Sequence, residues 1–123
     1  MERIIITGGK PLYGEISVSG FKNAAAPIIF ATILAQDKCV IENLPDISDV
    51  RVALDILTAM GAYVKYTGDT TVEIDTTNIN PGGAPVELVR KMRASYYLLG
   101  AELGRFGKAT VGTPGGCDLG EHF

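Results

Sequence analysis

The first twenty residues alternate hydrophobic and polar side chains in the way expected of β-strands. Residues 3–7 are rich in β-branched side chains, and residues 14–20 alternate polar and apolar positions with a period of two. Residues 8–11, Gly-Gly-Lys-Pro, supply a turn between them. The pattern predicts a strand pair that forms an N-terminal β-hairpin over residues 1–21.

Two helical patterns and one short strand follow this segment. Residues 23–35 are helix-forming and apolar on nearly every face, which is typical of a helix in a protein interior, and Pro27 lies close enough to the start to be tolerated. Residues 39–44 are typical of a strand. A second helix then extends to Met60, where Gly61 is placed to end it. Its apolar stripe consists of Val50, Ala53, Leu54 and Leu57.

The second half of the chain predicts a hairpin and a long helix. Residues 62–66 and 70–75 alternate as two strands around the Gly-Asp turn at residues 68–69. Residues 85–106 repeat apolar side chains at spacings of three and four, which predicts one long helix. Residues 109–112 predict a short strand. The stripe of the long helix consists of Val89, Met92, Tyr96, Leu99 and Leu103.

The order of these elements indicates an α/β fold. A helix followed by a strand recurs over residues 23–44, 49–66 and 86–112, which indicates a structural repeat. With 123 residues and 46% hydrophobic content, the chain has the size and apolar share of one domain. We therefore expect an α/β architecture with helices inside at least one layer of sheet.

Charge and cysteine content exclude several classes of function. Eleven basic against fourteen acidic residues, a net charge of −3, argue against a nucleic-acid partner. Cys39 and Cys117 lack metal-ligand spacing, and the single histidine, His122, completes no zinc site, so no metal is expected. The longest apolar run, residues 24–35, is shorter than the ~20 residues of a membrane span. We expect a cytoplasmic protein without a membrane partner.

Lys22 and Asn23 form the first candidate site. They follow Gly20 and Phe21 where a predicted strand gives way to the apolar helix. A helix N-terminus carries partial positive charge, so a lysine there is unfavourable unless an anion offsets it. Lys22 is therefore a candidate anion ligand, with Asn23 as a cap or a ligand contact. The alternative is that Lys22 points into solvent and Asn23 only caps the helix.

Arg93 is a second candidate for binding an anion. It follows Met92 of the apolar stripe, so we expect it at the edge of the buried face, where it could reach a diphosphate or a carboxylate. The alternative is a solvated basic helix face made by Arg90, Lys91 and Arg93.

Cys117 lies in a glycine-rich loop, Pro114-Gly115-Gly116-Cys117-Asp118, and three roles are open to it. It could be a nucleophile, a general acid or a buried filler. Asp118 should hold the proton on sulfur, which favours a proton donor. Cys39, inside an alternating strand, is expected in the core, and His122 has no visible partner set.

These residues together resemble a known family. Residues 14–25, 91–95 and 114–117 resemble three motifs of the UDP-N-acetylglucosamine 1-carboxyvinyltransferases, which are enolpyruvyl transferases of peptidoglycan synthesis. The resemblance runs in order through the chain as far as Gly120. Three ordered motifs at fitting distances are strong evidence, whereas any one alone is weak.

The resemblance implies a fold, a reaction and residue roles. The fold is an inside-out α/β barrel built of βαββαβ repeats, and the reaction transfers the enolpyruvyl group of phosphoenolpyruvate to the 3-hydroxyl of UDP-N-acetylglucosamine, the first committed step of peptidoglycan synthesis. No cofactor or metal is implied. Lys22 would hold phosphoenolpyruvate, Asn23 would contact both substrates and Arg93 would bind the UDP-sugar. Cys117 would protonate phosphoenolpyruvate and be alkylated by fosfomycin.

The chain also departs from the family pattern. Family members are longer, so the resemblance implies an incomplete first domain at residues 22–123 and a hairpin at residues 1–21 that in the family packs with the second domain. His122 stands where the family has an arginine. We therefore expect a fragment that is not competent alone and self-associates through unpaired apolar surface.

Two other functions compete with this interpretation. One is a non-catalytic remnant or interaction module. The other is a 3-phosphoshikimate enolpyruvyl transferase, but that group has Lys-Ser where this chain has Lys22 and Asn23, and it lacks the cysteine loop.

Overall fold

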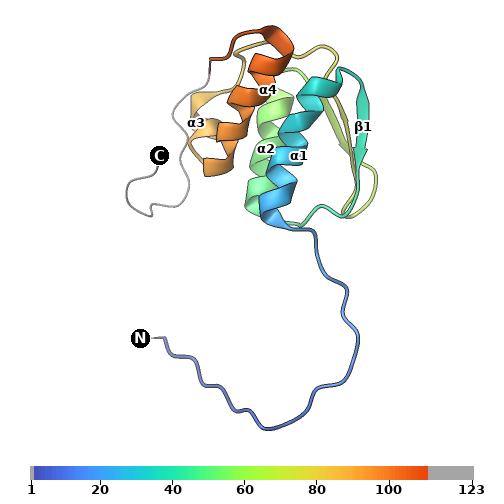
Figure 1. The fold of residues 1–123 in the computed structure, drawn as a ribbon, viewed down its shortest axis with the longest axis vertical. Coiled ribbons are helices and arrows are strands. Elements are labelled where there is room, and N and C mark those ends of the chain that lie inside the picture. Colours follow the sequence, from blue (N-terminus) through green and yellow to red (C-terminus); the bar gives the residue numbers. More distant parts are fainter. Residues whose placement is uncertain (1, 111–123) are drawn as a thin grey trace.

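The computed structural model describes residues 2–110, of which residues 22–106 form a helical layer on one face of a small sheet (Figure 1). In chain order the elements are α1 (Lys22–Ala35), β1 (Lys38–Ile41), α2 (Ser48–Ala59), β2 (Tyr63–Tyr66), β3 (Val72–Asp75), α3 (Val86–Val89), the 3₁₀ helix η1 (Arg93–Tyr96) and α4 (Tyr97–Phe106). The predicted α/β class is therefore confirmed.

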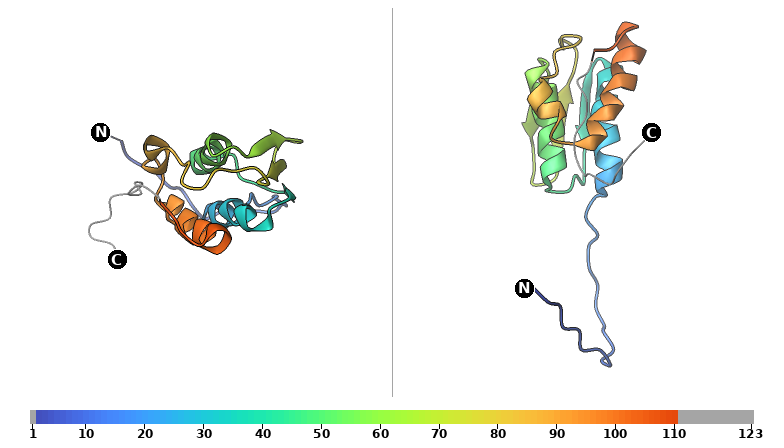
Figure 2. Two further views of the ribbon diagram at one scale, coloured as in Figure 1. Left: turned by 90° about the horizontal axis from the view of Figure 1, so that it is seen from above. Right: turned by 90° about the vertical axis from the view of Figure 1, so that its left-hand side faces the viewer.

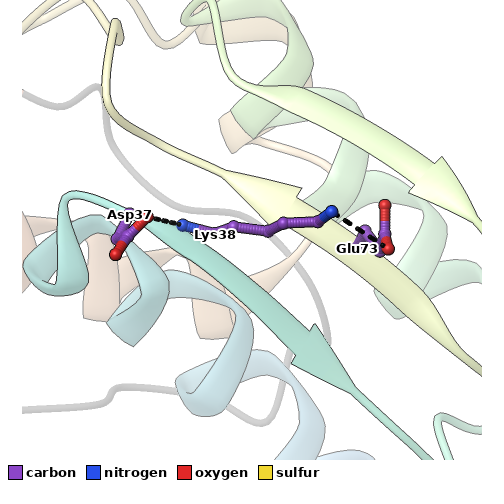
Figure 3. Close-up of polar contacts among 3 residues, drawn as sticks. All are labelled: Asp37, Lys38 and Glu73. Atoms are coloured by element: carbon purple, nitrogen blue, oxygen red, sulfur yellow. Dashed lines mark hydrogen bonds and ion pairs between the residues drawn. The ribbon is translucent and has the colours of Figure 1, made fainter.

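The sheet is antiparallel, in the order β1-β3-β2, and its two faces differ in polarity. Val72 and Ile74 of the central strand point toward the helices and are fully buried. On the opposite face, the ammonium of Lys38 lies 3.3 Å from the carboxylate of Glu73, and the backbone N–H of Lys38 donates to Asp37 (Figure 3). The helices therefore cover one face, and the other carries charged groups.

The predicted apolar stripe of α2 is confirmed. Val50, Ala53, Leu54 and Leu57 are all buried, as expected for spacings that place them on one face of the helix. The hairpin of β2 and β3 is also confirmed, with both strands slightly shorter than predicted. Gly61 follows α2 with φ of 108°, a conformation that favours glycine.

Helix α1 is buried on one side only. Ile29, Phe30 and Ile33 are essentially inaccessible in the core, but Ile28 and Leu34 each keep 49% of their surface exposed. The sequence predicted an interior helix because apolar residues occur on nearly every face. In the structure, α2 and α4 pack against only part of that surface (Figure 2), so apolar side chains of α1 remain partly exposed.

The predicted strand pair at residues 3–7 and 14–20 is not formed. The structure assigns no strand to residues 2–20, which run away from the body of the fold as an extended arm (Figure 1). The alternation suits a strand, but a strand also needs backbone partners to stabilise it. The apolar side chains of this arm remain 77–94% exposed, namely Ile4, Ile5, Ile6, Leu12, Tyr13, Ile16 and Val18.

The long helix predicted at residues 85–106 is wrong because it is interrupted. Met92 has an extended backbone, and the chain continues as η1 and then α4. The hydroxyl of the buried Ser95 donates to the carbonyls of Val89 and Met92, which gives carbonyls at the break a local partner. Residues 109–110 are not a strand, and residues 111–112 of that prediction lie outside the described range.

The predicted side-chain burial changes with this break. Val89 and Met92 are buried as expected, but Tyr96 and Leu103 are 62% and 54% exposed. Helix α4 instead buries Leu98, Ala101 and Glu102. Cys39, expected in the core, is only half-buried because it lies in an edge strand of the sheet.

Candidate functional site

Lys22 is the first residue of α1, and Asn23 is the second. The N-cap position is Phe21, whose carbonyl accepts hydrogen bonds from the backbone N–H groups of Ala24 and Ala25, and no side chain caps this end. Asn23 therefore does not cap the helix. The first turn of α1 contains no acidic residue, so its own sequence offers no carboxylate to offset the charge of Lys22.

Gly20 brings the chain into close contact with the loop before α2. A Cβ atom added to Gly20 would lie 1.9 Å from the carbonyl oxygen of Asn43 and 2.9 Å from Cδ of Pro45. Backbone atoms cannot yield as the end of a side chain can, so this approach requires glycine. The loop itself is fixed, since Leu44 is buried and its N–H donates to Thr70.

This contact places Lys22 beside the start of α2. The ammonium of Lys22 lies 3.5 Å from the carboxylate of Asp49, in the first turn of α2. Helices α1 and α2 begin at the same end of the molecule, where the N-terminal arm leaves it (Figures 1 and 2). Lys22 thus has a carboxylate partner in addition to its contact with solvent, and 55% of its side chain is exposed.

Arg93 begins η1 directly after the extended Met92. Met92 is buried and Arg93 is exposed, so Arg93 lies at the border of the buried surface as the sequence predicted, although the predicted long helix is absent. Helix η1 packs against α1, the element that carries Lys22. The structure therefore brings the elements of the two candidate cations together.

Cys117, Asp118 and His122 lie outside the described residues. Their predicted roles are untested, and the site consists here of Lys22, Asn23 and Arg93. Within residues 2–110, no set of three or more His, Cys, Asp or Glu side chains is gathered in a way that could hold a metal ion.

Sequence reasoning missed three polar residues that organise the fold near these elements. Asp49 was not singled out, although a carboxylate in the first turn of a helix is favoured there and was the available signal. Glu102 was not singled out, yet its buried carboxylate accepts hydrogen bonds from the N–H groups of Gly82 and Thr110 at 2.9 and 3.2 Å. Two backbone donors satisfy this carboxylate in the interior.

Arg105 is the third of these residues. Its guanidinium donates to the carbonyls of Ile33, Thr76 and Thr77, which joins α4 to the end of α1 and to the loop after β3. No pattern in the sequence pairs an arginine with carbonyls so distant along the chain.

An open depression of about 360 Å³ lies between α2 and β2, away from the candidate residues. It is lined by Arg51, Leu54, Asp55, Thr58, Val64 and Tyr66. None of the sequence-predicted site residues contributes to it, so we do not assign it to the site.

Comparison with known proteins assigns the family. A model of the family described as EPSP synthase (3-phosphoshikimate 1-carboxyvinyltransferase) matches residues 6–122. The chain belongs to this family. The predicted relationship to enolpyruvyl transferases is therefore confirmed.

The curated relatives with about 50% identity to this chain carry the name of one enzyme within the family. UDP-N-acetylglucosamine 1-carboxyvinyltransferase from Clostridium botulinum is 51% identical over 98% of this chain and 29% of the relative. UDP-N-acetylglucosamine 1-carboxyvinyltransferase 1 from Streptococcus agalactiae is 50% identical over 98% of this chain and 28% of the relative. The chain thus spans less than a third of the length of either relative.

A solved structure supports the assignment of this fold to the enolpyruvyl transferases. The crystal structure of the enolpyruvyl transferase NikO from Streptomyces tendae matches with a TM-score of 0.68 and 36% identity. The match covers 81% of this chain and 23% of NikO. In the described part of the chain, no helix is both long and apolar enough to cross a bilayer.

Proposed function

We propose that this chain supplies the phosphoenolpyruvate-binding part of an enzyme that transfers an enolpyruvyl group to the 3-hydroxyl of UDP-N-acetylglucosamine. The observation that carries the proposal is the position of Lys22 at a helix N-terminus without a side-chain cap, in a chain about 50% identical to curated transferases of that name. The positive end of α1 and the ammonium of Lys22 both favour an anion at this place.

The residues have separate roles in this proposal. Lys22 binds the phosphate or carboxylate of phosphoenolpyruvate, and Asn23 offers its amide to both substrates. Arg93 pairs with the diphosphate of the UDP-sugar, for which a guanidinium is well suited because it donates two parallel hydrogen bonds. No cofactor or metal is required.

The proposed reaction is an addition followed by an elimination. The sugar hydroxyl adds to C2 of phosphoenolpyruvate while Cys117 donates its proton to C3, which becomes a methyl group. Loss of a proton from that methyl group, which returns to the Cys117 thiolate, and departure of phosphate, which carries away the proton of the sugar hydroxyl, then restore the double bond. The enolpyruvyl ether and phosphate are the products, and the atoms balance without an oxidant or reductant.

UDP-N-acetylglucosamine is preferred over 3-phosphoshikimate as the acceptor. The curated relatives at about 50% identity carry the name of the UDP-sugar enzyme, and the chain has Lys22 and Asn23 in place of the Lys-Ser expected of the shikimate enzymes. We assign the reaction to peptidoglycan synthesis, and hence to cell wall formation, in the cytoplasm.

Turnover requires groups beyond those in this chain, because the relatives that it matches are more than three times as long. Catalysis of this kind needs both substrates aligned and shielded from water. Binding of phosphoenolpyruvate alone needs only the start of α1. Charge-assisted hydrogen bonds contribute about 1.5–3 kcal/mol each, so two of them correspond to a dissociation constant between about 40 μM and about 6 mM.

Titration of the 123-residue chain with phosphoenolpyruvate, followed by backbone amide NMR, tests this proposal. The signals of Lys22 and Asn23 are expected to shift, and Lys22→Met should abolish the shift. Lys38→Met is the matched control, because Lys38 is equally exposed and also pairs with a carboxylate, but on the outer face of the sheet. Equal binding by both variants, or no shift at the start of α1, would overturn the proposal.

A further inference from the structure

The residue that approaches Lys22 in this structure is a carboxylate from another helix. Asp49 Oδ2 lies 3.5 Å from Lys22 Nζ. Helix α1 has no acidic residue in its own first turn, so α2 provides the countercharge.

The N-termini of both helices favour this ion pair between Lys22 and Asp49. The partial positive charge at the N-terminus of α2 stabilises a carboxylate in the first turn of that helix. The same partial charge at the N-terminus of α1 disfavours the ammonium of Lys22. The carboxylate of Asp49 therefore offsets an unfavourable charge on the neighbouring helix at the point where the proposed substrate anion binds.

The pair is loose enough to be exchanged. The side chain of Lys22 is 55% exposed and that of Asp49 is 26% exposed, so solvent reaches the ammonium while the carboxylate is partly sheltered. Pairs between partly exposed charges change equilibria by about fivefold at most. An incoming anion with more negative charge and the N–H groups of α1 beside it can replace such a partner.

We propose that Asp49 is a competing countercharge that pairs with the ammonium of Lys22 beside the start of α1 in the unliganded protein and releases it when the substrate anion binds. The inference rests on the proposed function, because it requires Lys22 to bind the anion. It assigns to Asp49 the role of an internal countercharge, which keeps the lysine in place in the unliganded protein and competes with the anion for it.

A second carboxylate, just before the start of α2, provides the control. Asp46 forms an ion pair with Arg51 and lies only three positions from Asp49 in the sequence. Asp46→Asn removes the same charge from the same region of the protein but leaves the partner of Lys22 in place.

The experiment follows the ε-carbon signal of Lys22 by NMR while phosphoenolpyruvate is added to the 123-residue chain at low salt. Because Asp49→Asn removes the competing charge, it is expected to tighten binding by about two- to fivefold, and the gain should shrink as salt is raised. Asp46→Asn should bind like the parent chain, and Asp49→Glu, which keeps the charge, should bind nearly as the parent does.

The outcomes separate this inference from the proposed function. If Lys22 responds to phosphoenolpyruvate but Asp49→Asn binds equally or more weakly, the role of Asp49 is overturned while the proposed function stands. If Lys22 responds in no variant, the proposed function fails and this inference fails with it. Circular dichroism of Asp49→Asn and Asp49→Glu confirms that both variants remain folded.

Discussion

Gly20 lets the chain pass close to the loop before α2, just before α1 begins. Its missing Cβ lets the chain pass against the carbonyl of Asn43, and that contact brings Lys22 to Asp49 on the neighbouring helix. The sequence indicated a strand-to-helix junction with glycine and lysine, and the structure supplies the physical reason for the glycine. The role of Asp49 could not be predicted, because it depends on the packing of α1 beside α2.

Replacing Gly20 with alanine is expected to destabilise the protein and displace Lys22. The added methyl group would contact backbone at 1.9 Å, and overpacking of this kind costs about 1–3 kcal/mol. Urea denaturation measures the loss. Gly8→Ala is the matched control, because no atom lies within 4 Å of a Cβ at that position. Equal stability of the two variants would contradict the close approach.

Asp75 and Thr77 give a prediction for the dependence of stability on pH. The hydroxyl and the backbone N–H of Thr77 both donate to the Asp75 carboxylate, and these hydrogen bonds lower the pKa of Asp75. A lowered pKa in the folded state stabilises the protein above the unfolded pKa of the group, and this contribution is lost as the pH falls through the folded pKa.

Thr77→Val removes the hydroxyl donor, so the pKa of Asp75 should rise toward its ordinary value. NMR titration of the Asp75 carboxyl carbon measures this change. The variant should also lose less stability than the parent chain on acidification, since it has less of this contribution to lose. An unchanged titration of Asp75 would show that the hydroxyl does not lower the pKa.

At the scale of elements, the hydrophobic period predicted a helix or strand correctly where a continuous apolar pattern corresponds to one continuous element. The four buried positions of α2 and the hairpin of β2 and β3 were predicted correctly for this reason. Residues 85–106 were not, because apolar spacing continues across a break that Ser95 stabilises through hydrogen bonds to two carbonyls. Such a local competition between side chain and backbone leaves no mark on the hydrophobic period.

In the N-terminal arm, the sequence pattern is that of a strand but no strand is formed in the structure. Residues 14–20 alternate as a strand should, yet the described part of the chain pairs no strand with them. Alternation specifies which face a strand would bury, but the partner that covers this face must come from elsewhere. How this arm packs against a second domain stays a prediction.

At the scale of the whole molecule, apolar surface is left open on α1 as well as on the arm. Ile28 and Leu34 of α1 are both half-exposed, and the chain corresponds to less than a third of the curated relatives. Open apolar faces of this kind favour association.

Self-association through α1 is expected to weaken when Ile28 is replaced with lysine. Burial of an isoleucine side chain contributes about 1.5–3 kcal/mol, so its loss corresponds to tenfold or more in the association constant. Sedimentation velocity over a range of concentrations measures this change. Val40→Lys is the control, because Val40 is similarly exposed but lies on the charged face of the sheet. A parent chain that stays monomeric throughout would contradict the prediction.

Release of inorganic phosphate from phosphoenolpyruvate and UDP-N-acetylglucosamine tests the proposed function most directly. The assay combines this chain with the part of the Clostridium botulinum relative that it does not match. We predict no turnover by either piece alone, turnover by the mixture, and loss of that turnover with Lys22→Met or Cys117→Ser. A mixture that binds both substrates yet releases no phosphate, or that keeps full activity without Lys22, would contradict the account.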